Sequence, residues 1–80
     1  MTDAFTKQPL RVAKTGTAGP YVIVPLDQLP ALKATLDRHE VSYWVHETAI
    51  ALDGRNYSVV VDFARNADPQ QIQAILDAAV

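Results

Sequence analysis

Apolar and polar residues follow a helical period near the end of this chain. Within residues 68–79, apolar side chains recur three and four positions apart, as on an amphipathic helix. Asp68 followed by Pro69 is typical of an N-cap and the first helical residue. Gln71 then stands at the capping-box position. The side chains expected on the buried side of this helix are Ile72, Ile75, Leu76 and Ala79.

A second helix is predicted over residues 28–39, where polar residues surround one apolar stripe. Asp27 stands just before it, and its carboxylate is expected to accept a backbone N–H of the first turn as the N-cap. Pro30 falls within that first turn, where its missing N–H costs little. The apolar stripe is formed by Leu29, Leu32 and Leu36.

Other segments alternate with the period of two that β-strands show. Residues 10–14 alternate between apolar and polar side chains, as a half-buried strand does. Residues 21–24 are apolar on both faces, which indicates a central strand or a face used by a partner. Residues 42–45 are rich in strand-forming residues. Residues 50–52 and 57–63 flank Asp-Gly, a strong turn signal, and predict a hairpin.

The order of these elements predicts an α+β two-layer sandwich (ββαββα) with a four-stranded antiparallel sheet and two helices on one face. From residue 21 onward the order resembles the ferredoxin-like fold without its last strand. The strand at 10–14 would fill that place, giving a circularly permuted ferredoxin-like sheet. If 10–14 are a loop instead, the sheet has three strands and an exposed edge that invites pairing with a second chain. Residues 1–9 are expected to be a flexible arm, and residues 10–80 a single domain.

The amino-acid composition excludes several classes of function. The 80 residues contain 49% hydrophobic and 20% charged residues, as a folded domain does. There is no cysteine, which excludes disulfides, thiolate chemistry and cysteine zinc sites. No apolar run is long enough to span a membrane and no signal peptide is recognisable, so we expect no membrane association and a cytoplasmic location. The net charge of −2 argues against nucleic-acid binding.

The pairs His39-Glu40 and His46-Glu47 stand seven residues apart. On one continuous helix they would share a face and suggest a metal or acid–base site. Residues 41–45 have strand composition, however, so the first pair is expected at a helix end and the second after a strand, with a bulge at Glu47-Thr48. We therefore predict no metal site, no catalytic residue and no cofactor.

One surface stands out, on the sheet face away from the helices. If Tyr43 and Val45 point inward, Trp44 points outward and an aromatic-centred patch results, as at protein interfaces. A shift of one residue would instead bury Trp44 and expose Tyr43, and the sequence leaves both open. The candidate interface residues are Trp44, Val60, Ile23, Tyr21 and His46.

These features predict a non-catalytic interaction module that forms a homodimer through its open sheet face or an edge strand, or binds an unidentified protein. One alternative is a small-ligand sensor similar in architecture to ACT domains, with an anionic ligand at the helix start near Asp27. Another is single-stranded RNA stacked on Trp44 and Tyr21, as on RRM domains. The acidic balance and the absence of an RNP motif argue against RNA.

Overall fold

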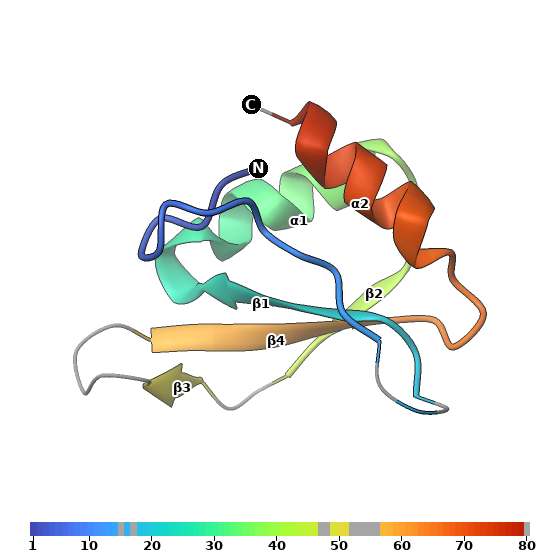
Figure 1. The fold of residues 1–80 in the computed structure, drawn as a ribbon, viewed down its shortest axis with the longest axis horizontal. Helices are drawn as coiled ribbons and strands as arrows, with labels where there is room; N and C mark the ends of the chain where they lie inside the picture. Colours follow the sequence, from blue (N-terminus) through green and yellow to red (C-terminus); the bar gives the residue numbers. More distant parts are fainter. Residues whose placement is uncertain (15, 17, 47–48, 52–56, 80) are drawn as a thin grey trace.

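The computed structural model of the chain describes residues 1–14, 16, 18–46, 49–51 and 57–79. Both helices lie on the same side of a small antiparallel sheet (Figure 1). In chain order the elements are β1 (Tyr21–Pro25), the 3₁₀ turn η1 (Leu26–Gln28), α1 (Leu29–Arg38), β2 (Tyr43–Val45), β3 (Ile50–Ala51), β4 (Tyr57–Phe63) and α2 (Pro69–Ala78).

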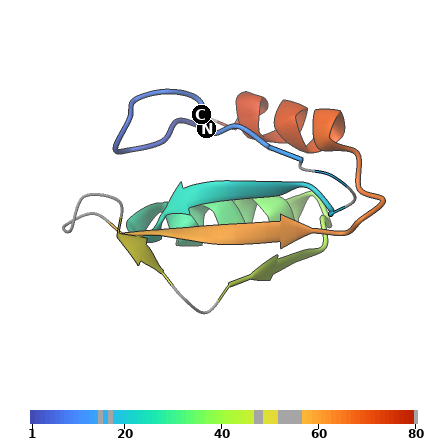
Figure 2. The same ribbon diagram turned by 60° about the horizontal axis from the view of Figure 1, so that its bottom comes forward.

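Strand β4 is the centre of the sheet. β1 pairs antiparallel along one of its edges, from Tyr21 opposite Asp62 to Pro25 opposite Ser58. β2 and β3 both pair with its other edge, β2 near the end of β4 and β3 near the beginning (Figure 2). Because β2 and β3 follow one another along the same edge, the sheet is three strands wide.

The predicted four-stranded sheet, ferredoxin-like or permuted, is therefore wrong, because residues 10–14 do not form a strand beside β1. Only Ala13 pairs with Tyr21, through two N–H···O bonds of 2.8 Å. The preceding residues bond to α2 instead. The Gln73 carboxamide donates to the Leu10 carbonyl at 2.8 Å and accepts from the Val12 N–H at 2.8 Å. These bonds and the burial of Leu10 hold the segment against α2 rather than along β1.

Residues 1–9 form a closed loop beside the helices. Thr2 and Pro9 form an isolated bridge, and the Asp3 N–H donates to the Gln8 carbonyl at 2.8 Å. The amino group of Met1 donates to the Leu76 carbonyl of α2. The division into an arm and a domain, and the flexibility of the arm, stay predictions.

The core lies between the two helices and one face of the sheet. In β1 and β4 the buried valines stand two positions apart, and the register sets Val22 opposite Val61 and Val24 opposite Val59. The apolar side chains of α1 and α2 complete this core. Burying one large apolar side chain stabilises the fold by about 1.5–3 kcal/mol. The buried apolar residues are Leu10, Val22, Val24, Leu32, Leu36, Val59, Val61, Phe63, Ile72 and Leu76.

The two helices begin differently. The predicted cap of α2 is confirmed, since the Asp68 carboxylate accepts from the Gln70 N–H at 2.9 Å and Pro69 is the first helical residue. The predicted Asp27 cap of α1 is wrong, because Gln28 is the N-cap and no side chain caps α1 among the described residues. The chain already winds through η1 before α1, so Asp27 lies inside a turn instead of before one.

Candidate protein-interaction site

On the helix-free face of the sheet, two rows of side chains cross all of β1, β4 and the β2 segment. The strand registers place Tyr21, Asp62 and Trp44 in one row. The next row holds Ile23, Val60 and His46, whose N–H donates to the Val60 carbonyl at 3.0 Å. We call these six residues the open-face patch. Five of them are the predicted interface residues. Asp62 is the addition, and the period of two in β4 identifies it, since it lies two positions beyond Val60.

Trp44 faces outward. It is 59% exposed, more than any other large hydrophobic side chain that the structure describes. Its neighbours Tyr43 and Val45 are half-buried and pack against the core. The structure thus selects the first of the two registers that the sequence leaves open. The role of the patch as an interface stays a prediction.

A polar pair borders the apolar part of the patch. His46 Nε2 donates a hydrogen bond to the Asp62 carboxylate. The two side chains are 51% and 41% exposed, so water screens the pair and it adds at most about 1 kcal/mol to the stability of the fold. Because Asp62 lies directly opposite Trp44, the bond keeps the imidazole within the patch. The pair therefore offers hydrogen-bonding groups beside an exposed indole.

On the covered side of β2, Tyr43 ties the strand to α1. Its hydroxyl donates to Asp37 Oδ1 at 3.0 Å. Desolvation of the phenol, followed by the hydrogen bond and the negative charge of Asp37, raises the pKa of Tyr43 above its usual 10.0. This contact fixes which side of β2 faces the helices, and so holds Trp44 on the opposite side.

The first His-Glu pair belongs to the end of α1. His39 is the C-cap, and Glu40 follows it with a φ of 57°, in the left-handed region. The Val41 N–H donates to the Leu36 carbonyl at 3.0 Å, and the Glu40 N–H donates to the Asp37 carbonyl at 3.1 Å. This is the Schellman pattern that closes a helix. The pair is therefore part of a helix stop.

The second pair lies elsewhere. His46 follows β2 on the open face, whereas the predicted bulge at Glu47-Thr48 lies outside the described residues. Within the part of the chain that the structure describes, no three or more His, Cys, Asp or Glu side chains are grouped to hold a metal ion. The two histidines thus serve different elements and do not converge.

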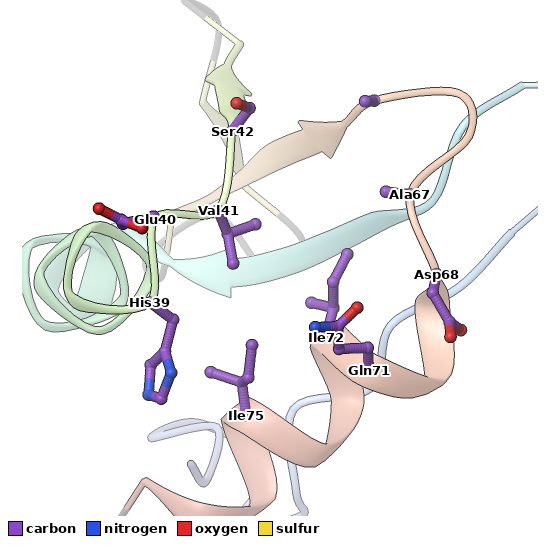
Figure 3. Close-up of a pocket in the computed structure, with 10 residues that line it drawn as sticks. His39, Glu40, Val41, Ser42, Ala67, Asp68, Gln71, Ile72 and Ile75 are labelled. Atoms are coloured by element: carbon purple, nitrogen blue, oxygen red, sulfur yellow. The ribbon is translucent and has the colours of Figure 1, made fainter.

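A pocket of about 280 Å³ separates the end of α1 from the start of α2 (Figure 3). Val41, Ile72 and Ile75 supply apolar lining, and His39 projects toward Ile75. Two carboxylates also border the pocket. Figure 3 shows Glu40 turned away from it, and the Asp68 carboxylate caps α2. Ser42 also lines the pocket, but among the described residues no hydrogen bond joins its hydroxyl to His39, so we assign no reaction to this pocket.

The expected anion site near Asp27 gains no support from the geometry. Asp27 is exposed in a three-residue turn. A pocket of about 430 Å³ lies beside Gln28 and Ala31, but Asp27 is not among its lining residues.

Among the helices that the structure describes, none combines the length and the apolar character needed to cross a membrane.

Comparison of the chain with protein-family models, curated proteins and solved structures gives no match. The geometry of the open-face patch is therefore the basis for a functional proposal.

Proposed function

We propose that this chain is a non-catalytic interaction module that binds a second copy of itself through the open-face patch and the adjoining edge of the sheet. The observation that supports it is the 59% exposure of Trp44 on the same sheet face as Ile23, which is itself 43% exposed. Tryptophan is enriched among the residues that dominate binding energy at protein interfaces. A small domain that leaves its single tryptophan in water gains most by covering it on association.

The chemistry of the patch suits a second copy. A two-fold interface brings the same surface together from both subunits, so the surface must complement itself. Trp44 and Ile23 supply apolar area, while His46 and Asp62 supply a donor and an acceptor of hydrogen bonds. None of the six residues is lysine or arginine, so RNA phosphates would find no strong cation there.

Light scattering over a hundredfold range of protein concentration tests the proposal. The wild-type protein is expected to change from the monomer mass to twice that mass. Trp44→Glu should keep the monomer mass at every concentration while its circular dichroism stays that of the folded protein. Leu26→Glu is the matched control, because Leu26 is 43% exposed in η1, outside the sheet, and it should associate like the wild type.

The single tryptophan provides a second measurement on the same samples. Covering Trp44 should shift its fluorescence to shorter wavelength as the concentration rises. A wild-type protein that stays monomeric, with an emission that does not change, contradicts the proposal. Association that survives in Trp44→Glu would place the contact away from the patch.

A further inference from the structure

The two outer edges of the sheet differ in how well they are protected. On the outer edge of β1, both backbone groups of Tyr21 are bonded to Ala13. Pro25, at the other end of β1, has no N–H to offer. Between them, only Ile23 directs both of its backbone groups outward without a partner among the described residues. The bonds from Tyr21 to Ala13 and the proline at position 25 are features by which proteins prevent a sheet edge from pairing with another chain.

The outer edge of β2 has no such protection. The His46 N–H donates to Val60 in β4. Because inward and outward backbone groups alternate along a strand, the N–H and C=O groups of Tyr43 and Val45 point away from β4. Within the described part of the chain, none of these groups has a hydrogen-bond partner. β2 contains no proline or lysine, so its edge is open to another strand.

We infer that β2 pairs antiparallel with β2 of a second copy, about a two-fold axis that passes beside Trp44. This inference rests on the proposed function and narrows the contact to the β2 side of the open-face patch, around Trp44, so that Tyr21 and Ile23 on β1 stay uncovered. Tyr43 of each copy exchanges both backbone hydrogen bonds with Val45 of the other, so every outward group of the strand is used. The two three-stranded sheets join into one, with all the helices on one face and both open-face patches on the other.

The side chains complement one another in this register. Trp44 lies opposite Trp44 of the second copy in a non-hydrogen-bonded pair, where the Cα atoms approach to about 4.5 Å and large side chains meet most closely. On the same face, Ser42 lies opposite His46 of the second copy, two polar groups able to bond. On the covered face, Tyr43 meets Val45. No like charges face each other in β2 or next to it.

Centring the axis on Val45 instead would be less favourable. The Trp44 side chain would then lie opposite His46 of the second copy, and Tyr43 would pair beyond the end of β2. Only the register about Trp44 pairs the whole of β2 with itself.

Disulfide trapping between two single-cysteine variants tests this register. The chain has no cysteine, so Ser42→Cys and His46→Cys each carry one thiol, and both retain Trp44. In the inferred dimer these positions face each other at a separation that suits a disulfide. Under mild oxidation, an equimolar mixture should yield the cross-linked heterodimer. Each variant alone should not, because identical positions lie roughly 14 Å apart along the strands.

A backbone variant provides an independent measurement. Val45→Pro removes the outward N–H, whereas Val45→Ala shortens the same side chain and keeps that N–H. Val45→Pro should raise the dimer dissociation constant by about tenfold or more relative to Val45→Ala. Circular dichroism of both variants verifies that they are folded.

The outcomes separate the two proposals. A wild-type dimer whose mixed variants do not cross-link overturns the β2 pairing but leaves self-association through the patch intact. Equal dissociation constants for Val45→Pro and Val45→Ala also overturn it. A wild-type protein that is monomeric throughout overturns both.

Discussion

Val60 and Val61 are neighbours in β4 with the same side chain, yet they lie on opposite faces of the sheet. Val61 is fully buried and faces the helices, opposite Val22 of β1. Val60 is only half-buried, opposite the exposed Ile23. The difference comes from what covers each face, since α1 and α2 lie on one side of the sheet (Figure 1).

The comparison shows what an apolar strand does and does not determine. β-branched residues on both sides of β1 and β4 favour strand structure whatever lies above them. A single layer of helices can cover only one of the two faces. The apolar residues on the other face then form a surface of the kind that marks an interaction site.

Replacing each of the two valines by alanine tests this comparison, and Val61→Ala is expected to have the largest effect on the free energy of unfolding. Val61→Ala should lower the free energy of unfolding by about 2 kcal/mol, because it removes buried methyl groups and leaves a cavity. Val60→Ala should lower it by less than about 1 kcal/mol. Urea denaturation at a protein concentration where the chain is monomeric measures both. Equal losses would mean that both faces are covered within one chain.

The covered face depends on α2, and its cap gives the next largest effect. Asp68→Ala should lower the free energy of unfolding by about 1 kcal/mol, because the Gln70 N–H loses its acceptor. Asp27→Ala is the control, since Asp27 caps no helix, and it should change stability by less than about 0.5 kcal/mol. Thermal unfolding of the two variants measures the difference. A larger loss in Asp27→Ala would restore the cap that the sequence predicts there.

A substitution at the end of α1 is expected to stabilise the fold instead of destabilising it. Glu40→Gly should raise the free energy of unfolding by about 0.5 kcal/mol, because glycine adopts the left-handed conformation of this position without steric cost. Arg38→Gly, within the last turn of α1, should lower it by about 1 kcal/mol. Neither change touches the open-face patch, so light scattering of both should match the wild type. A shift in association would mean that the helix end contributes to the contact.

Sequence signals predicted the elements whose causes are local. Asp68, Pro69 and the helical spacing of Ile72 and Leu76 lie within one segment, and α2 forms where they indicate. The alternation in β4 likewise places Val59, Val61 and Phe63 against the core. The same rule predicted the candidate interface residues and, applied once more, identifies Asp62.

The predicted strand at residues 10–14 failed because the bonding partners of this segment lie far along the chain. The alternation of residues 10–14 indicates extended backbone but does not say which groups it will bond. Its partner, Gln73, is 61 residues from Val12 and 63 from Leu10, and no local pattern connects them. Asp27 has the composition of a cap, but the turn of η1 before α1 shifts the helix start beyond it. Long-range bonding and backbone winding thus decided the points on which prediction failed.

The smallest expected effect is a pH dependence of stability that arises from Tyr43 on the covered face of β2 and not from Trp44 on the open face. Because the pKa of Tyr43 is higher in the folded protein than the unfolded value of about 10, the unfolded chain loses this proton first. Above pH 10 the folded state holds more protons at this site, so stability falls as pH rises. The stabilisation from Tyr43 is fully present below pH 10 and is lost as pH passes the raised pKa. Trp44, on the other face, does not titrate.

Tyr43→Phe removes the titrating group and the bond to Asp37 while keeping the aromatic ring packed against the core. Urea denaturation of this variant and the wild type between pH 8 and pH 11 should show a small difference in stability that is constant up to about pH 10 and shrinks above it. Tyr21 and Tyr57 are present in both proteins and cancel in the difference. A difference that does not change with pH would show that Tyr43 gains nothing from its proton in the folded state, and that β2 is held to α1 by packing alone.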